Sequence, residues 1–113
     1  MSRITTHVLD TALGRPAAGV PVTLERVDAG ATVVLGRGVT DTDGRLRDLA
    51  PPAPALHAGT YRITFDTAAY FAAQELDGFY PSVSVLFLVD DGIAHYHVPL
   101  LLSPYGYSTY RGS

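Results

Sequence analysis

The chain has 113 residues, of which 47% are hydrophobic, and a formal net charge of −3. These values predict a single globular domain, residues 1–113, and they argue against a nucleic-acid partner, which favours a basic surface. No run of about 18 apolar residues occurs, so we expect no membrane span. The first residues lack the apolar stretch of a signal peptide, which makes a cytoplasmic location the expectation.

Two residue types are absent, and their absence narrows the possible chemistry. The chain has no cysteine, which removes disulfides, thiol nucleophiles and thiolate metal ligands. All eight basic residues are arginines, so no lysine can form a Schiff base. Any catalysis must therefore use histidine, arginine, hydroxyl groups or carboxylates.

The first half of the chain alternates between apolar and polar residues, which is the pattern of β-strands. It predicts strands at residues 4–9, 20–25, 31–40 and, more briefly, 46–49. The segment "DTALGRPAAG" between the first two is rich in turn residues. The segment "DTDG" predicts a tight turn before the fourth strand, since Asp-Gly supplies the positive φ that short turns need.

The second half begins with a proline-rich loop, residues 50–59, where a strand ladder cannot continue. A strand follows at residues 61–65. The alanine-rich segment 66–76 is the one predicted helix, with Asp66 or Thr67 as its N-cap. The last two strands are predicted at 83–90 and 93–103, joined as a hairpin by "DDG". Seven or eight short strands and one helix predict a sandwich of two antiparallel sheets.

Two histidines lie on the last long strand, at a spacing that places both on one face. Tyr96, Val98 and their apolar neighbours occupy the opposite face, which is the better core candidate, so His95 and His97 are expected on the outer face. His-x-His is also a metal-ligand spacing. No third ligand stands at a matching spacing, so an exposed polar face is the simpler interpretation and no metal is predicted.

Other polar residues remain ambiguous when each is taken alone. His7 lies in the middle of the first strand, where most histidines are structural or solvated. Arg45 follows the Asp43-Gly44 turn; it is either a solvated hairpin residue or a planar fork for a carbonyl or carboxylate ligand. His57 in the proline-rich loop is expected at the surface. The chain has no Gly-x-Ser-x-Gly elbow, so a serine-hydrolase triad has little support.

Three segments together are more specific than any residue alone. They are "THVLDTALGRPAAGVPVTLE", "TDTDGR" and "HYHVPLLLSPYGYSTYRGS". In this order the chain resembles the transthyretin-related family from Ile4 to Ser113. The terminal "YRGS" is similar to the enzymatic branch of that family, which hydrolyses 5-hydroxyisourate in purine catabolism, whereas the hormone-binding branch lacks it.

The resemblance implies an all-β, transthyretin-like two-sheet Greek-key sandwich with one short helix. It implies a homotetramer, a dimer of dimers, with active sites in the channel between the dimers. The implied reaction hydrolyses a ring amide of 5-hydroxyisourate to give 2-oxo-4-hydroxy-4-carboxy-5-ureidoimidazoline. The resemblance implies neither a metal nor an organic cofactor. A tail docked into a subunit interface would also explain why distinctive residues stand at the end of the chain.

The resemblance also assigns residues to the site. The implied catalytic residues are His7, Arg45, His97 and Ser113, and the implied substrate-binding residues are Tyr110, Arg111 and Gly112. Either histidine is chemically competent as the base. Two other functions compete: a transthyretin-like carrier of a small aromatic ligand in the channel, and a structural sandwich with no small-molecule role. An apolar channel would not favour so many polar groups, which argues against the carrier.

Overall fold

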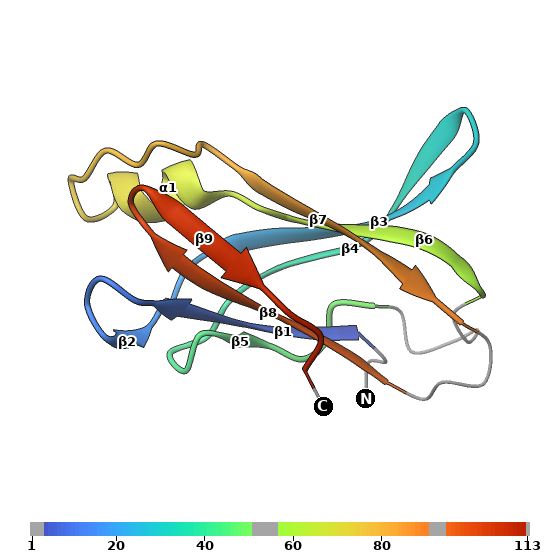
Figure 1. Ribbon diagram of the computed structural model, residues 1–113, viewed down its shortest axis with the longest axis horizontal. Coiled ribbons are helices and arrows are strands. Elements are labelled where there is room, and N and C mark those ends of the chain that lie inside the picture. Colours follow the sequence, from blue (N-terminus) through green and yellow to red (C-terminus); the bar gives the residue numbers. More distant parts are fainter. Residues whose placement is uncertain (1–3, 51–56, 91–94, 113) are drawn as a thin grey trace.

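The computed structural model describes residues 4–50, 57–90 and 95–112. Figure 1 shows two layers of strands, with the helix beside one end of the layers. The described elements are β1 (Ile4–Asp10), β2 (Arg15–Pro16), β3 (Pro21–Asp28), β4 (Ala31–Val39), β5 (Arg45–Leu46), β6 (Gly59–Phe65), α1 (Thr67–Ala72), β7 (Val83–Val89), β8 (Tyr96–Ser103) and β9 (Gly106–Thr109).

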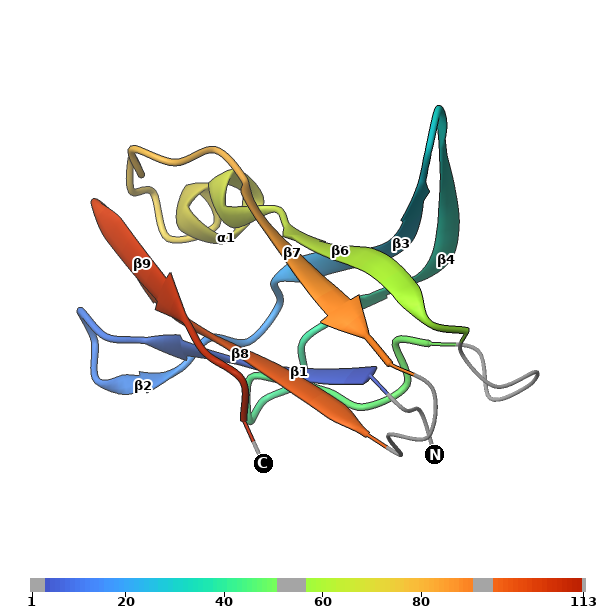
Figure 2. The ribbon, with the colours of Figure 1, turned by 45° about the vertical axis from the view of Figure 1, so that its right-hand side comes forward.

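The strands form two sheets that face each other (Figure 2). One sheet has the order β2-β1-β8-β9, with β5 also paired to β1, and the other has the order β4-β3-β6-β7. The predicted sandwich of two sheets with one short helix is therefore confirmed. Among the described residues, no helix has the length and apolar character to cross a membrane.

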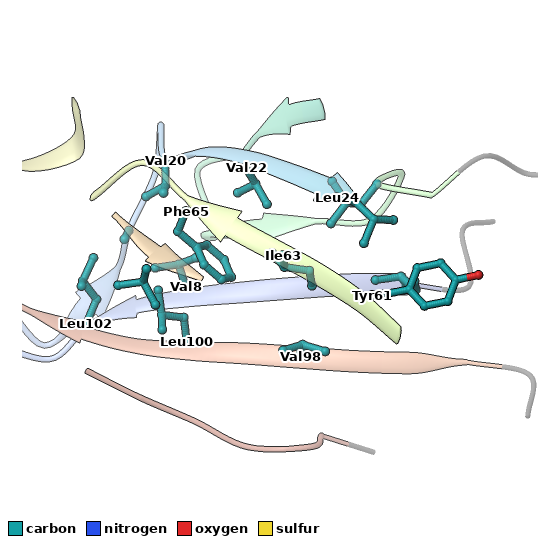
Figure 3. Close-up of a cluster of buried hydrophobic side chains, with 14 of the residues drawn as sticks. Val8, Val20, Val22, Leu24, Tyr61, Ile63, Phe65, Val98, Leu100 and Leu102 are labelled. Atoms are coloured by element: carbon teal, nitrogen blue, oxygen red, sulfur yellow. The ribbon is translucent and has the colours of Figure 1, made fainter. Parts of the chain in front are cut away.

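The core lies between the two sheets and is filled by alternate residues of their strands. Val8 of β1 and Leu100 and Leu102 of β8 point toward Ile63 and Phe65 of β6 (Figure 3). All five are at most 1% exposed. Burial of side chains of this size stabilises the fold by about 1.5–3 kcal/mol each. Since side chains alternate along a strand, the residues between them on β1 and β8 point to the outer face of their sheet.

The helix is capped as predicted and is tied to the end of β1. The Asp66 carboxylate accepts a hydrogen bond from a main-chain N–H of the first turn at 3.0 Å. The Tyr70 hydroxyl donates to buried Asp10 at 2.7 Å, and burial together with this carboxylate raises the pKa of Tyr70 to about 12. The helix has six residues and is shorter than the predicted segment 66–76.

The predicted strand pairing is wrong in two respects. β7 and β8 do not form a hairpin: β7 pairs with β6 in one sheet, and β8 pairs with β1 and β9 in the other. The β1–β8 pair is parallel, so only the β4-β3-β6-β7 sheet is purely antiparallel. A "DDG" segment suits a tight turn, but a local turn signal does not determine whether the chain crosses from one sheet to the other.

The sequence also misplaces the end of β5 and misses two strands, β2 and β9. The strand predicted at 46–49 is β5, which starts at Arg45 and already ends at Leu46. The chain also forms β9 after the strand that was predicted to be the last, with Leu100 paired to Thr109. β9 has four residues, three of them exposed, so its sequence carries little of the apolar alternation that indicates a strand.

Candidate active site

Three strands bring three of the predicted site residues, His7, Arg45 and His97, to one face. β1 and β8 run parallel, with Thr5 opposite His97, and β5 pairs with β1 so that His7 lies opposite Arg45. The core-facing neighbours of these residues, such as Val8 and Val98, are buried. His7, Arg45 and His97 are all half-buried. The outer-face position predicted for His97 is therefore confirmed, and residues distant in sequence meet on this face.

A tight turn before β5 sets the position of Arg45. The Asp41 carboxylate accepts hydrogen bonds from the main-chain N–H groups of Asp43 at 2.8 Å and Arg45 at 3.0 Å. The bond from Arg45 is the largest cause of a lowered pKa of Asp41. Gly44 has a φ of +75°, and a Cβ there would collide with the main-chain oxygen of Val8. The turn therefore needs glycine to lie this close to β1.

The same turn orients His7. The Nε2–H of His7 donates to the main-chain oxygen of Asp43 at 2.8 Å. A carbonyl oxygen can only accept, so in the neutral ring the proton is on Nε2 and the lone pair is on Nδ1. His7 therefore offers Nδ1 as a proton acceptor, the property that a general base requires.

His97 belongs to a second group of polar side chains on the same face. Its Nδ1 lies 2.8 Å from the Thr5 hydroxyl, and the Nε2 of exposed His95 lies 3.0 Å from the same oxygen. The two imidazole rings are stacked, with centroids 6.4 Å apart and planes 12° from parallel. The Thr5 hydroxyl thus joins both histidines of the His-x-His motif.

The surroundings of His97 keep its ring neutral. Burial is the largest cause that lowers the pKa of His97, followed by the positive charge of Arg45 and then by the two other histidines, His95 and His7. The Thr5 main chain acts in the opposite direction. Since the ordinary value for histidine is about 6.5, His97 is predominantly neutral at pH 7 and can accept a proton.

Within the described residues, Arg45 forms no ion pair, in contrast to Arg26, Arg47 and Arg62. Arg47 pairs with Asp41 and Arg62 pairs with Glu25. Within the described parts of the chain, no carboxylate forms an ion pair with the Arg45 guanidinium. The charge of Arg45 is therefore available to a ligand on this face, where it could neutralise negative charge on an oxygen.

Gly112 of the tail lies directly against His97. Its N–H donates to the main-chain oxygen of His97 at 2.8 Å. A Cβ at position 112 would lie 2.6 Å from Cδ2 of the His97 ring, closer than real Cβ atoms approach. Only glycine therefore lets the tail pass at this distance. Ser113, predicted as a catalytic residue, lies outside the described residues.

Tyr110 and Arg111 border a different part of the surface. The Arg111 guanidinium lies 5.1 Å from the ring centroid of Tyr96, whose side chain is on the core side of β8. Both tail residues line a cavity of about 290 Å³ between β7 and the β8–β9 edge, together with apolar side chains such as Leu86 and Leu88. Within this single chain, the tail thus divides between the histidine face and this cavity.

The structure also bears on two other predictions, the surface position of His57 and the question of a metal site. His57 is exposed, as expected, and its main-chain oxygen accepts a hydrogen bond from Tyr61 at 2.7 Å. Across the described residues, no three His, Cys, Asp or Glu side chains are grouped closely enough to hold a metal ion.

Sequence reasoning missed Thr5 as a member of the site. Thr5 is two residues before His7 and therefore shares its face, which was the available signal. Its contact with His97 depends on the parallel pairing of β1 and β8, across 92 residues of sequence. No local pattern predicts that register.

The fold and this polar face define a two-sheet sandwich with a histidine–arginine site on the outside of one sheet. The model of the HIUase/Transthyretin family matches residues 4–112. The chain belongs to this family. It is 47% identical over 110 residues to the 5-hydroxyisourate hydrolase of Salmonella dublin, covering 97% of this chain and 80% of that protein.

Two solved structures are also similar to the chain. One is a 5-hydroxyisourate hydrolase from Klebsiella pneumoniae, with a TM-score of 0.85 and 38% identity, covering 99% of this chain and 100% of that chain. The other is a transthyretin from Sparus aurata, with a TM-score of 0.90 and 32% identity, covering 99% of this chain and 97% of that chain. The fold is thus shared by proteins of both names, so function has to be inferred from the site and from the sequence relatives.

Proposed function

We propose that this chain hydrolyses 5-hydroxyisourate to 2-oxo-4-hydroxy-4-carboxy-5-ureidoimidazoline in urate breakdown. Its family and its relatives of that name, similar over nearly the whole chain, support a hydrolase. The observation that carries the proposal is the site itself. Two histidines and an arginine that forms no ion pair within the described residues share one face, and they supply proton acceptors and a positive charge for hydrolysis of a ring amide.

Hydrolysis of an amide imposes a proton balance on the site. The water oxygen bonds to the carbonyl carbon, the carbon–nitrogen bond breaks, and one proton moves from water to the departing nitrogen. His7 can accept a proton at Nδ1, because its Nε2–H is held by Asp43. His97 can accept one at Nε2 when its Nδ1 carries the proton of the contact with Thr5. We assign this pair to water activation and proton return, and either member can be the base.

Arg45 supplies the electrostatic part of the mechanism. Negative charge develops on the carbonyl oxygen as water attacks, and a fixed guanidinium stabilises it without reorganisation. The same positive charge contributes to the lowered pKa of His97, after burial. Arg45 therefore favours a neutral base before the attack and stabilises the oxyanion during it.

The tail and the assembly complete the proposal. Gly112 lies at His97, and we assign substrate positioning to Ser113 beyond it and substrate contacts to Tyr110 and Arg111. Since Arg111 lies toward the β7 cavity, this assignment suits a site completed by another subunit in a homotetramer, a dimer of dimers. The cytoplasmic location, the single domain and activity without a metal or cofactor remain predictions from the sequence.

A carrier of small aromatic ligands is the competing function, because a transthyretin shares the fold. The histidine face does not favour it: an apolar ligand would desolvate the Arg45 charge without pairing it. The relatives named 5-hydroxyisourate hydrolase also favour a hydrolase over a carrier.

The test is a turnover assay on 5-hydroxyisourate generated in situ from urate. The loss of substrate should be followed by ultraviolet absorbance, and the product by circular dichroism, because the substrate also decays spontaneously. We expect the protein to accelerate decay and to give one enantiomer of the product. Decay at the uncatalysed rate with a racemic product would contradict the proposed function.

A further inference from the structure

One hydroxyl joins two histidine rings at the site. Thr5 is 7% exposed, and its Oγ1 lies 3.0 Å from Nε2 of His95 and 2.8 Å from Nδ1 of His97. Both distances are those of hydrogen bonds. The proposed reaction uses His97 but assigns no role to Thr5 or His95.

A hydroxyl carries one proton and can donate only one hydrogen bond, which limits where the two histidine rings can carry their own protons. If Thr5 donates to His95, then the Nδ1 of His97 must be the donor in the other bond, so it carries a proton. If Thr5 donates to His97 instead, then His97 Nδ1 is unprotonated and the Nε2 of His95 carries the proton. When both bonds are formed between neutral rings, the tautomer of one histidine therefore determines the tautomer of the other.

Only the first arrangement suits a base at His97. With the proton on Nδ1, Nε2 keeps its lone pair and can take a proton from water. The imidazolium that forms still carries the Nδ1 proton, so both hydrogen bonds to Thr5 remain unchanged. The two hydrogen bonds that link His97, Thr5 and His95 thus already suit the imidazolium form of His97, and no side chain has to rotate when that form appears.

We propose that Thr5 and His95 are positioning residues, with His95 as the acceptor that draws the Thr5 hydroxyl proton away from His97. This inference rests on the proposed function, because it names what holds His97 in the form that the reaction uses. His95 contributes through its Nε2 lone pair, and the stacking of its ring on His97 is secondary. The His-x-His motif is then one member of the proton-transferring pair, His97, and the residue that sets its tautomer.

The matched substitutions at position 95 are His95→Gln and His95→Phe. Glutamine can place its side-chain oxygen near the former Nε2 and accept the Thr5 proton. Phenylalanine keeps a ring for stacking but has no acceptor, so Thr5 would donate to His97 and move the His97 proton to Nε2. We expect His95→Phe to lower kcat by about 10-fold or more with KM changed less than about threefold, and His95→Gln to stay within about threefold of the parent.

The matched substitutions at position 5 are Thr5→Val and Thr5→Ser. Valine keeps the branched shape and removes the hydroxyl, whereas serine keeps the hydroxyl. We expect Thr5→Val to lower kcat by about 10-fold and Thr5→Ser to recover most of the parent activity. Recovery by serine separates the loss of the hydrogen bonds from a packing defect.

The deciding readout is the tautomer of His97, measured by long-range ¹H–¹⁵N NMR on labelled protein at a pH where the ring is neutral. The parent and His95→Gln should show a proton on Nδ1, and His95→Phe should show it on Nε2. This measurement does not depend on turnover, so it tests the inference even if the parent fails to hydrolyse 5-hydroxyisourate, which would instead overturn the proposed function. Equal activity and equal His97 tautomers in His95→Phe and His95→Gln would overturn the positioning role.

Discussion

The two sheets of the sandwich both carry polar side chains on their outer faces, and one group of side chains on each face differs in its partners. On the β4-β3-β6-β7 sheet, Glu25 and Arg62 stand opposite each other and form an ion pair at 3.0 Å. Next to them, Thr64 and Ser84 share a hydrogen bond at 3.1 Å. On the sheet with β1 and β8, the positive charge of Arg45 stands beside histidines, and within the described residues no carboxylate pairs with it.

This difference separates a solvated surface from a site. A ligand that binds to groups already paired with each other has to break that pair first, so such groups gain little from binding it. An exposed ion pair itself contributes at most about 1 kcal/mol to stability. At the other face, burial and then the positive charge of Arg45 lower the pKa of His97, so the His97 ring stays available as a proton acceptor. Polar composition alone would not have distinguished the two faces.

The largest expected effect is the loss of either proposed base. His7→Ala and His97→Ala should each lower kcat/KM by about 100-fold or more, because proton transfer to and from the reacting groups is lost. The exposed His57 is the control, and His57→Ala should change the rate less than about twofold. Similar losses in all three variants, with altered circular dichroism spectra, would indicate a folding effect and contradict the assignment.

The second prediction compares one arginine from each outer face. Arg45→Met should lower kcat/KM by about 30-fold or more, since the oxyanion loses its electrostatic partner. Arg62→Met removes the same charge from the other sheet and should leave turnover within about twofold. If the two variants lost activity equally, the distinction between Arg45 and the ion-paired Arg62 would be wrong.

A smaller effect is expected where the tail meets His97. Gly112→Ala places a methyl group 2.6 Å from the present position of His97 Cδ2, so the ring or the tail has to shift. We expect about a 10-fold loss of kcat, since misplacing a catalytic group by a fraction of an ångström is costly. Gly106 is the control, because a Cβ there meets only the Ser103 hydroxyl at 3.7 Å. An active Gly112→Ala variant would remove Gly112 from the site.

The fourth prediction concerns pH. Since burial and Arg45 lower the pKa of His97, its ring stays neutral to a lower pH than an ordinary histidine does. The acid limb of kcat/KM should therefore lie below about pH 6.5 if His97 is the base. Arg45→Met removes a positive charge, so it should raise the pKa of His97 in an NMR titration. A lowered or unchanged pKa in this variant would contradict the electrostatic coupling.

The sequence predicted those parts of the fold that depend on short segments of the chain. The alternation around Val8 and Val98 predicted which residues face the core, and Asp66 predicted the start of α1. The parallel β1–β8 pair, β9 and the contact of Thr5 with His97 did not follow, because they depend on pairing between segments far apart in the chain. His7, Arg45 and His97 were grouped through the family resemblance, and the register places them on one face.

The smallest expected effect lies at the Glu25–Arg62 ion pair. Glu25→Gln should lower the free energy of unfolding by less than about 1 kcal/mol, because the partly exposed pair with Arg62 is screened by solvent. Denaturant titration measures this change, and turnover should be unaffected. A loss of several kcal/mol would mean that the Glu25–Arg62 pair has a structural role larger than its exposure indicates.

The central claim is that the histidine–arginine face formed by β1, β5 and β8 is where a planar purine-like ligand binds. Titration with urate, followed by the histidine ring signals in ¹H–¹⁵N NMR, locates that ligand directly. The signals of His7 and His97 should shift in a saturable manner, while that of His57 should not move. Saturable shifts at the aromatic and methyl signals of the β7 cavity, with His7 and His97 unchanged, would contradict the account.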